Sequence, residues 1–204
     1  MATFTNKSEL ISSMRSGNNL DWDIIIIGGG ITGAGILREA VRRGYKSLLI
    51  EKKDFSWGTS SRSSKMIHGG LRYLAAGDYK LTKESVQERQ RLLKEAPGLI
   101  YPISFFFSFR IGLFPGPWVM RLILLIYDWF ARKKDHRFYK NSELSKKFTN
   151  LDQDNLNGAV AYTDAMVDDS RLVLRLLQDS ISFGASAINY TEIREFITID
   201  SKAV

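Results

Sequence analysis

The stretch DWDIIIIGGGITGAG, residues 21–35, decides the fold. Its isoleucine run is apolar and β-branched and ends at glycines, which is typical of a strand buried on both faces of a parallel sheet. Residues 36–43 continue at helical spacing as far as Gly44, and KSLLIE, residues 46–51, predicts a second buried strand. Strand, glycine-rich turn, helix and strand together predict a βαβ unit, the core of an α/β, Rossmann-like fold with a parallel sheet.

Three glycines at the turn, Gly28, Gly30 and Gly33, have the spacing G-x-G-x-x-G. The first permits the tight turn, the second lets a pyrophosphate approach the backbone, and the third lets helix and strand pack closely. Glu51 ends the second strand, where a carboxylate accepts hydrogen bonds from an adenosine ribose. A glycine-rich packing turn is the alternative, but the flanking strand, helix and acid favour a site for a dinucleotide, either NAD or FAD.

The composition narrows the class of protein. The 204 residues are 44% hydrophobic and 25% charged, which describes a globular chain and excludes a disordered, collagen-like or coiled-coil protein. Because the chain has no cysteine, disulfides, cysteine-bound metals and thiol catalysis are excluded as well. With His68 and His136 as its two histidines, we expect no metal site. Residues 1–20 are polar and lack the apolar segment of a signal peptide, so we expect a cytoplasmic protein.

Most of the net charge of +7 lies between Arg132 and Lys147 and follows an apolar stretch, WVMRLILLIYDWFA, residues 118–131. As a helix this stretch would span about 21 Å, too short for the roughly 30 Å hydrocarbon core of a bilayer. Two interpretations stay open. Residues 118–147 form either a helix in the membrane interface beside anionic headgroups, or a buried helix followed by a solvated charged run. Aromatic residues are not interleaved with the basic ones, so no nucleic-acid partner is expected.

Serine and glycine are frequent between residues 54 and 70, a composition typical of a flexible linker. We interpret this segment instead as part of a cofactor site. Hydroxyl side chains can donate hydrogen bonds to phosphates or to the polar edge of a flavin, and Gly69 and Gly70 would let the backbone approach a flat ring. FAD is therefore favoured over NAD. The hydroxyl residues are Thr59, Ser60, Ser61, Ser63 and Ser64.

Three separated stretches carry a family resemblance: DIIIIGGGITGAG (23–35), TSSRSSKMIHGGLRYL (59–74) and YTDAMVDDSRLVLRLLQDSISFGA (162–185), with Glu51 between the first two. In these the sequence resembles FAD-dependent glycerol-3-phosphate dehydrogenase, within the D-amino-acid-oxidase-like flavoprotein superfamily. The resemblance implies a glutathione-reductase-like FAD-binding fold with FAD as the cofactor. Members of the family have several hundred residues, so we expect this chain to be an N-terminal portion in which the fold is incomplete.

The resemblance also implies which residues touch the cofactor. The ADP half of FAD would lie on the glycine turn and at the end of the second strand, beside Gly28, Gly29, Gly30, Ile31, Thr32, Gly33, Glu51 and Lys52. The pyrophosphate and flavin would lie beside Thr59, Ser60, Ser61, Ser63, Ser64 and Lys65, and the ring would be bordered by His68, Gly69, Gly70 and Leu71. Ile193, on an expected late strand, would offer backbone groups to adenine, or is an ordinary sheet residue.

Three residues are candidates for the substrate and the chemistry. Arg72 and Tyr73 are expected at the substrate end of the pocket, because a guanidinium matches phosphate oxygens bidentately. The alternative is that Arg72 makes a structural ion pair and Tyr73 belongs to the core. His68 is the candidate catalytic residue, as acceptor of the hydroxyl proton, or else a flavin neighbour held by the backbone.

The activity implied by the resemblance is oxidation of sn-glycerol 3-phosphate to dihydroxyacetone phosphate, with electrons passed from FAD to a quinone in the membrane. The implied partners are glycerol 3-phosphate, a quinone or another membrane electron acceptor, the membrane surface through residues 118–147, and a second copy in a homodimer. This would place the protein on the inner face of the cell membrane. A glycerol-3-phosphate oxidase that uses oxygen and a truncated, non-catalytic dinucleotide-fold fragment are the alternatives.

The predicted organisation has four parts. Residues 1–20 are a polar arm with a short helix capped by Ser8, 21–76 are the FAD-binding βαβ unit with the flavin-contacting segment, 77–150 are a helical insertion, and 151–204 return to the FAD-binding domain. The elements expected beyond the βαβ unit are helices over 79–96 and 118–131, a strand over 103–109, a helix capped by Asp168 or Asp169 that runs to Phe183, and a strand over 185–200.

Overall fold

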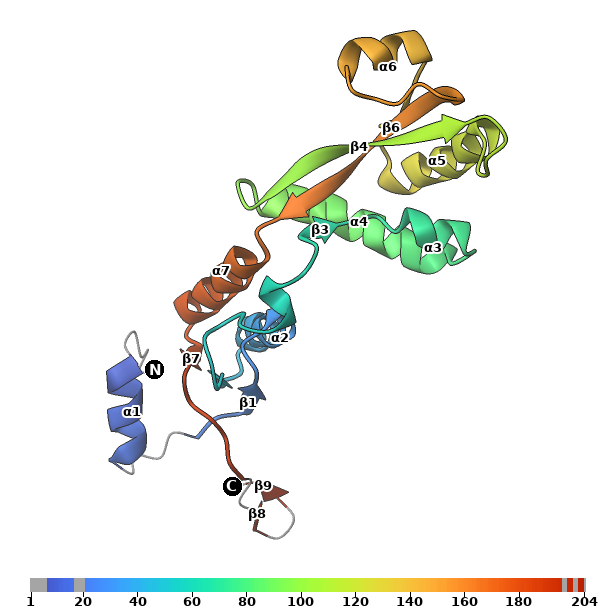
Figure 1. Ribbon diagram of the computed structural model, residues 1–204. Coiled ribbons are helices and arrows are strands. Elements are labelled where there is room, and N and C mark those ends of the chain that lie inside the picture. The colour runs from blue at the N-terminus through green and yellow to red at the C-terminus, as the bar shows by residue number, and fades with distance from the viewer. Residues whose placement is uncertain (1–6, 17–20, 196–197, 200–201, 204) are drawn as a thin grey trace. The chain divides into compact units, whose positions relative to one another are not determined.

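The computed structural model describes residues 7–16, 21–195, 198–199 and 202–203 (Figure 1). The chain divides into two compact units, which we call the first unit (residues 1–64 and 168–204) and the second unit (65–167). The first unit contains α1 (Lys7–Arg15), β1 (Ile24–Ile27), α2 (Ile31–Arg42), β2 (Ser47–Ile50), the 3-10 helix η1 (Thr59–Ser61), α7 (Asp169–Ser182), β7 (Ser186–Ile188), β8 (Thr198–Ile199) and β9 (Lys202–Ala203). The second unit contains β3 (Met66–Ile67), α3 (Leu71–Ala75), α4 (Tyr79–Glu95), β4 (Ile100–Arg110), α5 (Pro117–Ala131), β5 (Arg137–Tyr139), α6 (Asn141–Lys147) and β6 (Leu156–Val167).

A parallel sheet with the order β1-β2-β7 forms the centre of the first unit, and Ile24 pairs with Ser47 in its first register. Helices α2 and α7 pack on the sheet through a shared apolar cluster that includes Ile26, Leu37 and Val173, all less than 9% exposed. Burial of each such side chain contributes about 1.5–3 kcal/mol to folding. The predicted α/β fold with a βαβ unit and a parallel sheet is therefore confirmed.

Strand β1 is buried on one face only within the first unit, which corrects the prediction of a strand buried on both. Side chains alternate along a strand, so Ile26 enters the core while Ile25 and Ile27 point to the opposite face. Within the described residues these two side chains are 54% and 56% exposed. An unbroken apolar run predicts that both faces of the strand are apolar. It does not determine whether other residues cover the second face.

The described part of the N-terminal arm packs against this sheet. Leu10 of α1 is 2% exposed and packs with Leu48 and Ile188, and Lys7 Nζ donates a hydrogen bond to the Asn189 carbonyl (2.5 Å). The helix begins at Lys7, so the predicted capping residue Ser8 lies inside its first turn. The remainder of the predicted arm, 1–6 and 17–20, lies outside the described residues.

Helix α7 follows its prediction closely. The Asp168 side chain accepts a hydrogen bond from the Arg171 amide (3.1 Å), which is an ordinary N-cap, and Gly184 takes a left-handed φ of +95° just beyond the helix. Val173 and Leu177 are its buried apolar side chains, whereas Leu172 is half-buried.

The predicted continuous strand over 185–200 is wrong, because β7 and β8 occupy only parts of this range and irregular backbone follows β7. β7 ends at Ile188, and Tyr190 takes a left-handed φ of +52°, which breaks the extended backbone. The amides of Tyr190 and Thr191 then donate to the carbonyls of Lys53 and Glu51 (both 2.9 Å). Ile193, expected on this strand, lies in irregular backbone; residues 196–197 and 200 lie outside the described part of the chain.

The second unit has an antiparallel sheet in which β6 pairs with β3, β4 and β5. The helices expected over 79–96 and 118–131 and the strand over 103–109 are present as α4, α5 and a longer β4. The strands β5 and β6 were not predicted. Because Met66 of β3 pairs with Met166 of β6, the compact unit reaches beyond both predicted limits of the insertion, 77–150.

Candidate dinucleotide-binding site

The glycine turn in the first unit joins the end of β1 to the start of α2. Gly28 takes a φ of +109°, which favours glycine, and its amide donates to the Ile50 carbonyl (2.8 Å). A Cβ on Gly33 would lie 1.9 Å from the Gly28 carbonyl oxygen. Helix α2 therefore crosses the turn at a distance that only a glycine permits, and Gly33 has the packing role that the spacing predicted.

The N-terminus of α2 offers hydrogen-bond donors at this turn. Gly30 is the N-cap and provides no side-chain acceptor, while the Ile31 amide donates to Ser60 Oγ (2.9 Å). In the described part of the chain, no hydrogen bond engages the amides of Thr32 and Gly33. Free first-turn amides and the positive end of the helix dipole attract an anion such as a pyrophosphate.

Glu51 lies directly against the turn. Its Oε2 accepts a hydrogen bond from the Gly29 amide (2.7 Å) and its Oε1 accepts one from the Lys53 amide (2.8 Å). Each carboxylate oxygen has a second lone pair, so the group can still accept from ribose hydroxyls. The sequence did not reveal the bond to Gly29, which gives Glu51 a second task in fixing the turn. Lys52 beside it is exposed.

The serine-rich segment is folded against the same turn, so the linker interpretation is excluded by its hydrogen bonds. Ser56 is 2% exposed and takes a φ of +62°, and its amide donates to the Gly29 carbonyl (2.9 Å). The composition of the segment did not predict this contact. The Ser56 hydroxyl donates to the Ser60 carbonyl (2.9 Å). Ser60 thus reaches the start of α2, which brings one of the predicted hydroxyl residues to the site.

The other predicted hydroxyl residues are placed differently. Thr59 is exposed on η1, and the Ser61 hydroxyl donates to the Gly58 carbonyl (3.2 Å). The Ser63 hydroxyl donates to Asp169 Oδ2 at the start of α7 (2.8 Å) rather than lying at the glycine turn. Ser64 is exposed as well. Of this set, the structure therefore brings Ser60 to the turn.

Residues 68–73 belong to the second unit, where the structure brings His68, Arg72 and Tyr73 together. The His68 and Tyr73 rings have centroids 5.8 Å apart, and the Arg72 guanidinium lies 5.9 Å from the centroid of the Tyr73 ring. Arg72 is exposed and makes no ion pair with another described residue; Tyr73 is half-buried. Gly70, with a φ of +74°, is the N-cap of α3, and Leu71 is the first residue of this helix.

A buried charged network holds this segment and is not among the predictions made from the sequence. Asp164, 3% exposed, accepts at Oδ1 from the Gly69 amide (3.0 Å), from the Tyr127 hydroxyl (2.7 Å) and from Arg89. Burial raises the pKa of Tyr127 well above its usual range, so the hydroxyl keeps its proton as a donor. A signal existed: Arg89 lies at helical spacing from buried Val86, which places a cation on the apolar face of α4.

The geometry of the first unit fits the ADP half of a dinucleotide. A family model described as FAD dependent oxidoreductase matches residues 23–204. The chain belongs to this family. The predictions of a flavoprotein oxidoreductase family and of FAD as its cofactor are confirmed by this match.

Two curated relatives show how far the similarity extends. The aerobic glycerol-3-phosphate dehydrogenase of Bacillus subtilis is 36% identical over 186 residues, which is 90% of this chain and 34% of that protein. The mitochondrial glycerol-3-phosphate dehydrogenase of Homo sapiens is 37% identical over 185 residues, 86% of this chain and 25% of that protein. The chain therefore spans about a third or less of the length of these relatives.

Solved structures agree with the fold. The glycerol-3-phosphate dehydrogenase of Bacillus halodurans, solved in complex with FAD, superposes with a TM-score of 0.69 at 26% identity and covers 96% of this chain and 32% of its own. A glycine oxidase from Bacillus cereus has a TM-score of 0.57 at 20% identity over 90% of this chain and 50% of its own, which supports the fold alone. The predicted resemblance to glycerol-3-phosphate dehydrogenase is thus confirmed.

The described residues meet the requirements neither of a metal site nor of a membrane-spanning helix. No cluster of three or more histidine, aspartate or glutamate side chains among them is arranged to hold a metal ion. None of the helices in the described ranges has the length and apolar character needed to cross a bilayer.

We predict that Glu51→Ala weakens FAD binding by roughly 10-fold to 100-fold, because hydrogen bonds to a charged acceptor contribute about 1.5–3 kcal/mol. Isothermal titration calorimetry of the purified chain with FAD measures the change in affinity. Glu39→Ala is the matched control, since Glu39 is an exposed acid on α2 that pairs with Arg43 (2.8 Å). Equal affinities for the two variants would refute the role of Glu51.

Proposed function

We propose that the first unit holds the ADP half of FAD and that the protein serves the oxidation of sn-glycerol 3-phosphate to dihydroxyacetone phosphate. The glycine turn, with its free amides and the Glu51 carboxylate beside it, is the observation that supports the binding of FAD. The substrate half is supported by relatives at 36% and 37% identity that are named glycerol-3-phosphate dehydrogenases. Bound FAD would supply an acceptor that takes two electrons together and releases them singly.

The residues that we assign to the ADP half are those of the turn and its neighbours. The pyrophosphate would meet the amides of Thr32 and Gly33, and the ribose would meet Glu51. This assignment is supported by the close packing at Gly33, which leaves the helix N-terminus directly beside the end of β1. Ile193 offers no strand geometry in support of adenine binding, and its role stays a prediction.

We assign the substrate chemistry to the second unit. Oxidation at C2 requires a group that anchors the phosphate and a base that accepts the hydroxyl proton. Arg72 is an exposed guanidinium without an ion-pair partner among the described residues, which suits a phosphate. An imidazole nitrogen of His68, whose ring lies 5.8 Å from that of Tyr73, would accept the proton.

An anaerobic absorption experiment tests the reaction. The FAD-loaded protein is mixed with glycerol 3-phosphate, and in parallel with glycine and with L-proline, the substrates suggested by the names of fold neighbours. Bleaching of the flavin bands by glycerol 3-phosphate alone is expected. Bleaching by an amino acid instead, or by none of the three compounds, would contradict the proposed substrate.

The electron acceptor separates the two forms of the proposed enzyme. We propose a quinone, as the family resemblance implies, and keep the oxygen-using oxidase as the alternative. Reoxidation of the reduced flavin by a short-chain ubiquinone without hydrogen peroxide supports the dehydrogenase, whereas peroxide formed in air at a similar rate supports the oxidase. The predicted homodimer and the predicted cytoplasmic location also stay predictions; light scattering measures the first.

We further propose that the second unit binds a membrane surface through one side of α5. We call this side the α5 outer face, formed by Trp118 (80% exposed), Leu122 (63%), Leu125 (50%) and Trp129 (74%). The opposite side of the helix, with Met120, Leu124 and Tyr127, is buried in the unit. An exposed apolar face that is rich in Trp and followed by basic residues is typical of a helix that lies in the membrane interface.

We predict that Trp118→Gln combined with Leu122→Gln lowers affinity for phospholipid vesicles by about 10-fold or more, because each change removes apolar area that would enter the bilayer. Co-sedimentation with large vesicles measures the affinity. Leu174→Gln combined with Phe183→Gln is the matched control, since both side chains are exposed in the first unit, 49% and 65%. A similar loss in both double variants would contradict a specific role for α5.

A further inference from the structure

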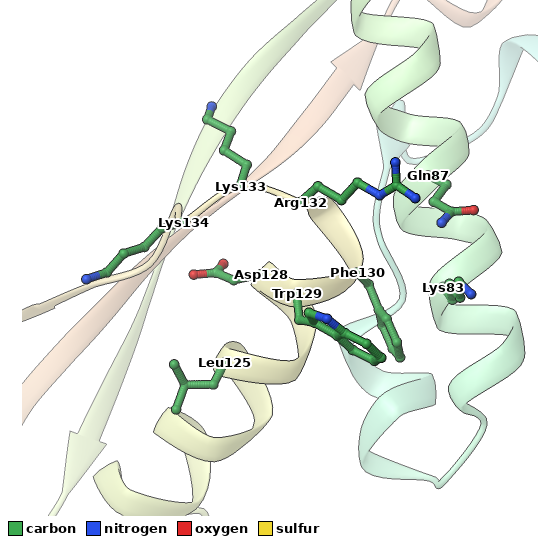
Figure 2. A pocket seen from close by; sticks show the side chains of 9 residues that line it. All are labelled: Lys83, Gln87, Leu125, Asp128, Trp129, Phe130, Arg132, Lys133 and Lys134. Carbon is green, nitrogen blue, oxygen red and sulfur yellow. The ribbon is translucent and has the colours of Figure 1, made fainter.

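A pocket of about 570 Å³ lies between α4 and the C-terminal end of α5 in the second unit (Figure 2). Trp129 and Phe130 form its aromatic wall, with ring centroids 5.3 Å apart. Lys83 and Gln87 of α4 stand across from them, and the Arg132 side chain extends toward Gln87 in Figure 2. The pocket therefore combines an apolar wall with polar and basic groups from two helices.

Positive charge at the pocket is left unbalanced. Its one acid, Asp128, is engaged at Oδ2 by His136 Nδ1 (2.7 Å) and by the Asp135 amide (3.2 Å). Lys133 lies 3.8 Å from Asp135, whereas Lys83 and Arg132 form no ion pair with any described residue. Lys83 and Arg132, without ion pairs and beside an aromatic wall, favour an anionic ligand, because each would gain a partner without losing one.

Helix electrostatics alone do not account for both cations. Arg132 is the C-cap of α5, where a positive charge favourably meets the negative end of the helix dipole. Lys83 is the fifth residue of α4, toward the positive end of that helix, where its charge brings no such benefit. A ligand that bridges the two helices explains why both cations border one pocket.

We propose that this pocket binds the headgroup of an anionic phospholipid, with the phosphate between Lys83 and Arg132. The proposal rests on the proposed membrane role and names the lipid that the second unit would select. Leu125 and Trp129 line the pocket and also belong to the α5 outer face, so the apolar path for the acyl chains begins at the headgroup site. This continuity favours a lipid over a soluble phosphate compound.

Monomeric dihexanoyl phosphatidylglycerol, used below its micelle concentration, tests the pocket without a membrane. Saturable change of Trp129 fluorescence is expected, identified by its absence in Trp129→Phe, and dihexanoyl phosphatidylcholine should give at least 10-fold weaker binding. Inorganic phosphate should not displace the lipid at comparable concentration. Equal binding of the two lipids, or displacement by phosphate alone, would overturn the proposal.

Charge variants distinguish lipid binding in the pocket from attraction of the lipid by the net charge of the protein. Lys83→Gln with Arg132→Gln should weaken binding of the short-chain anionic lipid by about 10-fold or more. Lys80→Gln with Lys94→Gln, two exposed lysines on α4 outside the pocket, removes the same charge and should change it by less than about twofold. Equal losses in the two double variants would mean that net charge, not the pocket, attracts the lipid.

Vesicles distinguish failure of this proposal from failure of the membrane role. The Lys83→Gln/Arg132→Gln variant should still bind neutral vesicles like the wild type but lose its preference for vesicles with phosphatidylglycerol. A wild-type chain that binds vesicles without such a preference would retain the membrane role and refute the headgroup site. A wild-type chain that binds no vesicles would refute the membrane role, and the monomeric lipid then decides the pocket by itself.

Discussion

Gly33→Ala is expected to destabilise the first unit by roughly 3 kcal/mol or more and to abolish FAD binding. The added Cβ would lie 1.9 Å from the Gly28 carbonyl oxygen and 3.1 Å from its carbon. Both are backbone atoms of the turn, so neither can rotate away as a side chain would. Relief requires α2 to move off β1, which opens the apolar core and displaces the amides that face the cofactor.

Gly35→Ala is the control for this prediction. It lies two residues further along α2, and a Cβ there meets nothing within 4 Å. Because alanine favours the helix over glycine by about 1 kcal/mol, this variant should be as stable as the wild type or more stable. Urea unfolding followed by circular dichroism measures both variants. Similar stabilities for the two would show that α2 does not pack on the turn as closely as described.

Asp164→Ala is expected to destabilise the second unit by about 3–5 kcal/mol. It would leave the Arg89 guanidinium, 2% exposed, without its carboxylate, and removal of one partner of a buried pair is strongly destabilising. The Gly69 amide and the Tyr127 hydroxyl would lose their acceptor as well. Gly69 lies between His68 and Arg72 in the sequence, so substrate affinity should fall together with stability.

Asp152→Ala provides the comparison, since Asp152 pairs with Arg110 (2.9 Å) on the surface, where its side chain is 61% exposed. Exposed ion pairs contribute only about 0–1 kcal/mol. Urea unfolding monitored by tryptophan fluorescence should separate the two variants by at least about 2 kcal/mol. If both lose the same small amount, the buried network does not hold the second unit.

Local patterns predicted the elements that local interactions determine. The isoleucine run, the glycine spacing and the acid at position 51 lie within about 30 residues of one another, a span in which a βαβ unit is fully specified. Helix α7 was equally predictable, because Asp168 and Gly184 are local start and stop signals. The second and third stretches of the family resemblance, 59–74 and 162–185, then pointed to FAD.

Long-range contacts account for what the sequence did not predict. Asp164 is separated from Gly69 by 95 positions, and neither residue type alone indicates a partner. The turn at Tyr190 depends on acceptors from Lys53 and Glu51, so the expected strand could not be excluded from the sequence. The serine-rich segment likewise became ordered through contacts with the glycine turn, which composition cannot report.

Titration of the purified chain with FAD tests the central claim, that the first unit holds the ADP half of the cofactor. Binding of one FAD per chain is predicted, with displacement by ADP, because the contacts lie at the pyrophosphate and ribose. Gly35→Ala should retain this binding and Gly33→Ala should lose it. A folded chain that binds no FAD, or one whose FAD is not displaced by ADP, would contradict the account.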